Sequence, residues 1–241
     1  MIRTLASILV LIALLFGISI AAKDRKTPVV DPTRGAIGVS IKIKGPTPLS
    51  VATNAVHAFF VKIEEGVDVL QAKEILLGRF NEANQIYLLN VEPGTYVAIG
   101  TTTLVKKLVI NRVYFDKEMI QATAVTVEAG KIAFMGEIVA KEGFLLKNAD
   151  EAQTYYLKHL GGGMIAKLQS LDRDSKTTTE FWQRAVKDAF KDEPDWQELA
   201  RRQVSNVSRA LLLHGAAANR QRAILRASSL ATSASHVVDS R

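Results

Sequence analysis

The sequence predicts an α+β protein in which an antiparallel β-sandwich is followed by a helical C-terminal region. Three observations support this prediction. Between residues 36 and 145, apolar residues repeatedly alternate with polar ones, which is the period of strands that have one side in water. After Gly143, the apolar residues recur at the wider spacing of helices. Glycine-bearing turns separate the expected strands, and short antiparallel strands with such turns are typical of sandwiches.

The first expected strand begins at Ala36 and stops at Gly45-Pro46. Its β-branched residues occupy every second position and therefore share one face, whereas the intervening positions are glycine or polar. These residues are Ile37, Val39, Ile41 and Ile43, alternating with Gly38, Ser40, Lys42 and Lys44. Apolar runs predict further strands over residues 59–63, 75–77, 85–91, 95–103, 107–115, 119–127 and 131–140.

One short motif occurs twice in this half of the chain. Residues 91–96 read VEPGTY and residues 127–132 read VEAGKI, so each has a strand end, an acid, a glycine and a new strand. Glycine supplies the positive φ that lets an antiparallel strand return. Each motif is therefore predicted to close a β-hairpin.

Residues 87–100, YLLNVEPGTYVAIG, resemble the "apolar strand, Pro-Gly, Tyr, strand" signature of prealbumin-like and carboxypeptidase-regulatory-like β-sandwiches. With the second turn, the arrangement is similar to a group of uncharacterised bacterial exported proteins and lipoproteins that carry such a sandwich. The resemblance covers residues 36–143. It implies a sandwich fold and an envelope location, and it implies no activity. Unlike the lipoprotein members, this chain has no cysteine for lipidation.

The second half predicts helices. Residues 149–160 form one helix, Gly161-Gly162-Gly163 interrupts it, and residues 164–171 resume it. Thr177 and Glu180 have the spacing of a capping box, which predicts a new helix start. Pro194 opens a further helix, because proline is tolerated in a first turn. The alanine-, serine- and arginine-rich end is expected to fray into a partly disordered tail.

The N-terminus predicts export. Arg3 precedes the uncharged run LASILVLIALLFGISIAA over residues 5–22, and Ser19-Ile20-Ala21 places small residues where a signal peptidase cuts. The predicted organisation is a signal peptide over residues 1–21, a linker over 22–35, a sandwich over 36–145 and a helical region over 146–241. The alternative is an uncleaved anchor over residues 5–22, because about 20 apolar residues span a bilayer.

The positive charge is concentrated at the C-terminus. The chain has a net charge of +7, and residues 199–241 contain seven arginines and one acid. Such a region is either a solubilising face or a surface for an anionic partner, namely an acidic protein, an envelope component or a lipid headgroup. Because export is predicted, nucleic acid is not an expected partner.

The familiar catalytic patterns are absent from the sequence. The four histidines, His57, His159, His214 and His236, form none of the close pairs typical of zinc sites. There is no cysteine and no G-x-S-x-G nucleophile elbow, and the glycines at 161–163 lack the Gly-Lys-Ser/Thr of a phosphate-binding loop. The acids at 64, 65 and 68 and at 172 and 174 are interpreted as solvated loops. We therefore expect no catalytic residue, metal or cofactor.

The sequence thus predicts a non-enzymatic exported envelope or periplasmic module that binds a partner or has a structural role. Its candidate contact residues are Phe181, Trp182, Trp196, Arg201, Arg202 and Arg209. Aromatic and arginine residues together favour a partner groove or membrane surface, although an aromatic stripe at helical spacing equally fits a core. One alternative is a membrane-anchored protein whose tail binds anionic lipid. A second is a hydrolase whose cleft joins Glu or Asp to His57 or His159.

Overall fold

The computed structural model describes residues 27–47, 50–64, 66, 68–72, 74–78, 80–105, 109–145 and 151–210. The described strands are β1 (Gly35–Lys44), β2 (Thr53–Ile63), β3 (Leu76–Gly78), β4 (Phe80–Glu82), β5 (Gln85–Val91), β6 (Gly94–Val105), β7 (Val109–Phe115), β8 (Val125–Val127), β9 (Ile132–Leu145) and β10 (Met164–Asp172). The helical elements are the 3₁₀ turn η1 (Val69–Gln71), α2 (Lys117–Ala122), α3 (Glu151–His159), α4 (Ser175–Arg184), the π-helical turn η2 (Ala185–Ala189) and a helix described over residues 194–210.

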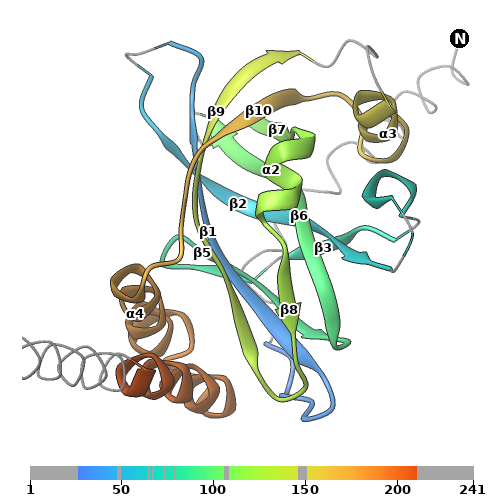
Figure 1. The fold of residues 1–241 in the computed structure, drawn as a ribbon. Coiled ribbons are helices and arrows are strands. Elements are labelled where there is room, and N and C mark those ends of the chain that lie inside the picture. The colour runs from blue at the N-terminus through green and yellow to red at the C-terminus, as the bar shows by residue number, and fades with distance from the viewer. Residues whose placement is uncertain are drawn as a thin grey trace, which may run out of the picture.

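Six of these strands close into a barrel (Figure 1). Its order is β2-β6-β7-β10-β9-β1, and the pairing of β1 with β2 completes the ring. The β1–β9 and β7–β10 pairs are parallel, whereas the other pairs are antiparallel. Below its contact with β2, β1 instead pairs with β5, and β5 pairs with β4, so the sheet branches away from the barrel.

The predicted antiparallel sandwich is therefore wrong. The decisive element is β10, because residues 164–171 were expected to continue a helix. They form a strand that is paired along both edges, with Ile165 against Tyr114 of β7 and Lys167 against Lys141 of β9. Periodicity cannot separate a short apolar run in a strand from one in a helix, so the sheet pairing decides the conformation.

The two repeated turns do not close hairpins between the strands that flank them. Among the described pairings, β5 contacts β1 and β4, while β8 contacts β6. The two motifs meet each other instead: Gly94 pairs with Val127 and Tyr96 with Val125. Gly94 has φ of 150° and Gly130 has φ of 66°, so both turns do require glycine. They act as corners where the chain passes to another part of the sheet.

A second local prediction is also corrected. Residues 119–127 were expected to form one strand, but α2 occupies their first half. The side chain of Asp116 accepts a hydrogen bond from the Met119 backbone N–H at 2.9 Å and so caps this helix. Met119 and Ile120 are buried, because α2 closes over one side of the barrel.

The barrel interior is filled mainly by aliphatic side chains from all six strands. The inward residues of β1 and β9 lie beside one another, since Ile41 pairs with Ile138 and Ile43 with Ala140. This interior forms one continuous core that includes Ile41, Ile43, Ala55, Phe60, Ile99, Val113, Phe115, Ile138, Ala140 and Ile165.

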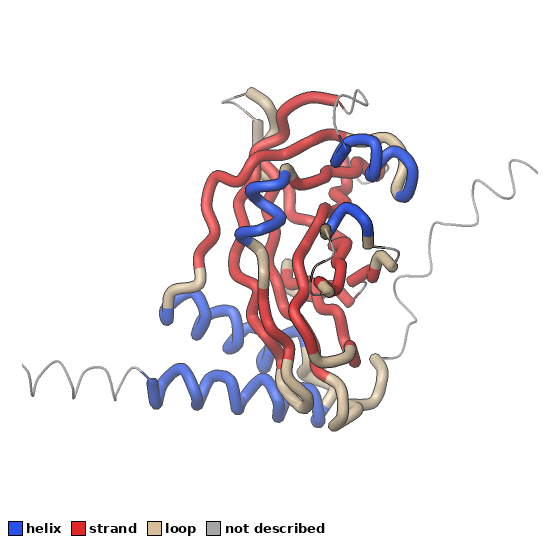
Figure 2. The backbone as a smooth tube through the Cα atoms, turned by 45° about the vertical axis from the view of Figure 1, so that its right-hand side comes forward, coloured by secondary structure: helices blue, strands red, loops and turns tan. Residues whose placement is uncertain are grey.

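A second apolar cluster lies outside the barrel. The helical segment 175–200 packs against the outer side of β1, β5 and β9, on one side of the lower barrel in Figures 1 and 2. We call this the outer aromatic cluster. Its buried members are Ala36, Tyr87, Ile132, Phe181, Trp182, Ala185, Ala189, Phe190, Trp196 and Ala200.

The predicted helices are confirmed at α3, at α4 and from residue 194, with one boundary changed. Asp174, and not Thr177, is the N-cap of α4, because its carboxylate accepts the Thr177 N–H at 2.6 Å. The capping-box pattern therefore lay one turn inside the helix.

Candidate functional site

The three aromatic residues predicted to contact a partner are buried. Phe181 and Trp182 are 0% and 1% exposed, and Trp196 is 2% exposed. The Phe181 ring lies over Gly38 of β1, where an added Cβ would lie 2.9 Å from two ring carbons. Gly38 therefore allows α4 to approach the sheet closely. The outer aromatic cluster uses these side chains for packing and does not present them to a partner.

Polar contacts fix the same helices. The buried Gln85 side chain donates from Nε2 to the Phe181 carbonyl at 2.8 Å and accepts from the Tyr87 hydroxyl at 3.0 Å. Trp196 donates from Nε1 to the Pro28 carbonyl at 2.6 Å. Arg184 forms an ion pair with Glu137 of β9. The helical segment is thus held to the sheet by side chains.

The predicted arginines are exposed, unlike the aromatic residues. Arg201, Arg202 and Arg209 lie on helix 194–210, which turns its Trp196 and Ala200 face toward the sheet. Arg202 contacts Glu198 at 3.2 Å, and Arg201 donates to the Gln197 side chain at 2.5 Å. Both contacts join positions four apart on one helix, so they hold the side chains in place without burying them. The guanidinium groups remain accessible.

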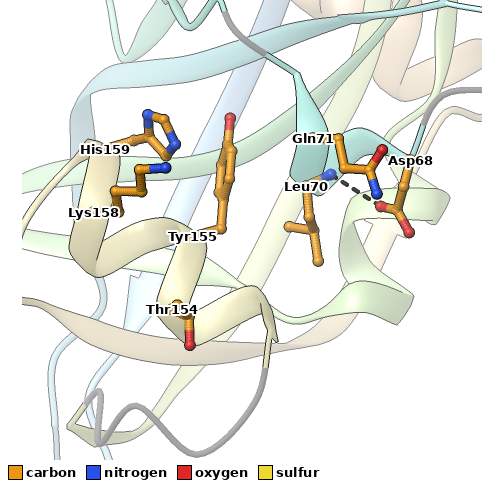
Figure 3. Close-up of a pocket in the computed structure, with 7 residues that line it drawn as sticks. All are labelled: Asp68, Leu70, Gln71, Thr154, Tyr155, Lys158 and His159. Carbon is orange, nitrogen blue, oxygen red and sulfur yellow. Dashed lines mark hydrogen bonds between the residues drawn. The ribbon is translucent and has the colours of Figure 1, made fainter.

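A pocket of ≈ 350 Å³ lies between η1 and α3 (Figure 3). Its lining residues are Asp68, Leu70, Gln71, Thr154, Tyr155, Lys158 and His159. Lys158 and His159 come from the last turn of α3, where cations offset the negative end of the helix dipole. The volume falls within the range of small-molecule sites, which is roughly 300–1,000 Å³.

Tyr155 stands in the middle of this pocket. Its hydroxyl donates to the Ala72 carbonyl at 3.1 Å, so the ring connects α3 to the chain just after η1. Burial raises the pKa of this phenol. The His159 ring lies against Tyr155 with centroids 4.7 Å apart. The wall of the pocket that carries Lys158 and His159 is therefore supported by a fixed aromatic ring.

The pocket brings His159 and Asp68 to one cavity, as the hydrolase alternative required, but it places them on opposite walls. Figure 3 shows Tyr155 between them. The Asp68 carboxylate accepts the Leu70 N–H at 2.9 Å as the cap of η1, and Lys117 lies 4.0 Å from its other oxygen. Asp68 thus orders its own loop and does not orient the imidazole. The arrangement suits binding better than proton transfer.

No local pattern in the sequence indicates this pocket. Its two walls are far apart in the chain, and η1 contributes only a three-residue turn. In the sequence, His159 has no close ligand partner, and Lys158, Tyr155 and Gln71 belong to no recognisable site motif. Only the packing of α3 beside residues 68–72 joins them.

The other residues considered for chemistry have structural roles where they are described. His57 contacts the Thr102 hydroxyl through Nδ1 at 3.1 Å, on adjacent strands. Gly161 accepts from the Tyr114 hydroxyl at 3.0 Å. Asp172 accepts the Asp174 N–H at 2.9 Å, just before α4. Within the described ranges, no group of three His, Cys, Asp or Glu residues is placed to hold a metal ion. His214 and His236 lie outside those ranges.

Comparison with known proteins found no relative. No protein-family model matches the chain, and no curated protein or solved structure matches it significantly. The resemblance to exported prealbumin-like proteins therefore remains a prediction. Among the residues that the structure describes, no helix is long and apolar enough to cross a membrane. The proposed signal or anchor at residues 5–22 lies outside them.

Proposed function

We propose that this protein is a non-enzymatic, exported envelope or periplasmic binding module. The barrel is the scaffold, and the exposed face of helix 194–210 is the contact surface. The observation that supports this most directly is the two-sided character of that helix. Trp196 and Ala200 are 2% and 0% exposed, whereas the arginines at 201, 202 and 209 face solvent. A helix fixed on one side and basic on the other suits an acidic protein or envelope component.

The contact residues of this proposal are revised from the sequence prediction. Phe181, Trp182 and Trp196 set the position of the helices, and Arg201, Arg202 and Arg209 provide the contacts. Arg202, Asn206 and Arg209 share a face, because they are separated by four and three positions. A partner with carboxylate or phosphate groups would pair with such guanidinium groups.

Site-specific photo-crosslinking in cells tests this surface. A photoreactive residue at Asn206 should give a discrete adduct, whereas the same residue at exposed Thr126 of β8 should not. Adding R202Q/R209Q should remove the adduct. The control K131Q/K176Q removes the same charge from two exposed ion pairs and should keep it. Equal adducts at both positions, or an adduct that R202Q/R209Q leaves unchanged, would exclude the helix as the contact surface.

The pocket between η1 and α3 supports a second candidate, the binding of a small anionic molecule. Lys158 and His159 supply cationic or hydrogen-bonding groups, and Leu70 and Tyr155 supply apolar contact. Thermal shifts with a panel of small carboxylates and phosphates test it. A shift seen with the wild type and lost in K158M, but retained in K187M, would support this candidate. No shift with any member would oppose it.

A further inference from the structure

The strand register places three lysines side by side on the outside of the barrel. Lys44 of β1 pairs with Lys141 of β9, and Lys141 pairs with Lys167 of β10. We call these residues the lysine row. Lys42 precedes Lys44 by two positions and so lies on the same face of β1. Residues 44, 141 and 167 are neighbours only because their strands pair, so the local sequence does not indicate the row.

The lysine row points away from the core. All three side chains are exposed, whereas their neighbours Ile43, Ala140 and Ala166 are 2%, 0% and 0% exposed. Lys141 and Lys167 are directly opposed in the antiparallel β9–β10 pair, where Cβ atoms lie about 4.5–5.5 Å apart and like charges destabilise the fold. The repulsion between adjacent lysines therefore lowers the stability of the isolated protein.

No described acid compensates this charge. In the part of the chain that the structure describes, no carboxylate lies within 4 Å of these lysines or of Lys42. The acids nearest along β9 are engaged elsewhere. Glu137 pairs with Arg184, and the Glu142 side chain accepts from Asn111 at 2.8 Å. The lysine row is available to an external anion.

Exposed apolar side chains surround the same end of the barrel. At this end, which is uppermost in Figure 1, β1, β6 and β9 finish and β2, β7 and β10 begin. Leu104 and Ile110 are paired across β6 and β7 and are 42% and 51% exposed. Leu145 ends β9 at 63% exposure, and Val51 precedes β2 at 87%. We call these four residues the apolar rim.

We propose that this end of the barrel docks on the surface of an anionic phospholipid bilayer. The lysine row lies at the level of the headgroups, and the apolar rim enters the interface beyond them. Lysines close to an anionic membrane each add attraction, and apolar side chains at the tip add burial that is independent of charge. A soluble polyanion would use the lysines but would gain nothing from the apolar rim. The combination therefore favours a bilayer.

Co-sedimentation with vesicles tests the lysine row in the full chain. Vesicles contain phosphatidylcholine and phosphatidylglycerol in equal amounts, or phosphatidylcholine alone. K141Q/K167Q should weaken binding to the anionic vesicles by about 25-fold, at roughly fivefold per lysine. The control K187Q/K191Q removes the same charge from exposed sites near the helices and should bind like the wild type. Equal binding of the two variants, or equal binding to both vesicle types, would overturn the proposal.

Fluorescence at single positions tests the apolar rim separately from residues 5–22 and from the arginines. Because the chain has no cysteine, one introduced cysteine carries the only thiol-linked dye. An environment-sensitive dye at I110C or L145C should shift to shorter wavelength on anionic vesicles. The same dye at V29C, where valine is 79% exposed, should not shift. Equal shifts at all three positions would overturn the proposed orientation. Binding to a soluble polyanion, without a shift on vesicles, would overturn the bilayer as the occupant.

Discussion

The barrel interior and the outer aromatic cluster are both well buried, but different forces hold them. In the barrel, each of the six strands is hydrogen-bonded through its backbone to a neighbour on either side, and the aliphatic core fills the ring. In the outer aromatic cluster, helices lie on the sheet and are fixed by rings and a few side-chain contacts, such as Trp196 with Pro28. Because backbone pairing closes the barrel, we expect it to unfold as one cooperative unit, and we expect the helical layer to separate from it more readily.

Two large-to-small substitutions test this difference most strongly. Phe60 inside the barrel and Trp182 in the outer aromatic cluster are 0% and 1% exposed. Phe60→Ala and Trp182→Ala should each lower the free energy of unfolding by about 3–5 kcal/mol. Hydrogen exchange should show loss of protection throughout the chain for Phe60→Ala. It should show loss in α4 and helix 194–210 for Trp182→Ala. The same protection pattern in both variants would mean that the two cores unfold as one.

The contribution of the Trp196 hydrogen bond is expected to be smaller. Trp196→Phe keeps most of the buried ring but removes the indole N–H that donates to Pro28. One hydrogen bond contributes about 1 kcal/mol, and the Pro28 carbonyl would lose its partner. Urea denaturation of Trp196→Phe and Trp196→Ala separates this contribution from ring packing. Equal stability of the two variants would show that the hydrogen bond, and not the ring, anchors the helix.

The smallest expected effects are those of pH on stability. The pKa shifts that cause them have opposite signs in the barrel and in the helical layer. Burial raises the pKa of Glu142 in the barrel wall, while its hydrogen bond from Asn111 acts against this shift. The Thr177 N–H lowers the pKa of Asp174, which caps α4. The raised pKa means that the stability associated with protonated Glu142 is lost as the pH rises through that value. The lowered pKa means that the contribution of Asp174 is lost as the pH falls through its folded-state value.

Denaturation of two variants between acidic and neutral pH checks these signs. Glu142→Gln should stabilise the protein at neutral pH, because it removes a charge that burial disfavours. The gain in the free energy of unfolding should be only a few tenths of a kcal/mol, since the carboxyl is only partly shielded from solvent. Asp174→Asn should reduce the acid-induced loss of α4 and leave the barrel unaffected. If Glu142→Gln instead lowers the free energy of unfolding at neutral pH, the ionised carboxylate stabilises the barrel.

The sequence predicted the parts of the fold that depend on local pattern. Alternating residues in β1 and helical spacing around α3 and from residue 194 indicated the correct elements. Barrel closure was not predictable, because it depends on β1 pairing with β9 and on β10 entering between β7 and β9. Residues 164–171 satisfy a helix and a strand equally well by periodicity. Only their long-range partners distinguish the two conformations.

The candidate sites show the same limit. A stripe containing Phe181 and Trp182 has helical spacing whether it faces a partner or a sheet, and Gly38 beneath Phe181 gave no indication of the contact. The arginines were identified correctly as exposed, because their charge opposes burial. The lysine row depends on the register of three strands, so individual lysines in the sequence carried no signal.

The parallel pairing of β1 with β9 has a consequence for the order of folding. β1 ends at Lys44. One of its edges pairs with β2 and β5, but β9, which pairs with the opposite edge, begins only at Ile132. During synthesis, the edge of β1 that pairs with β9 therefore stays unpaired until residues 132–145 have been synthesised. Long-range parallel pairing is slow, and such edges aggregate readily. A chain that emerges in this order therefore leaves one edge of β1 open until β9 has been synthesised.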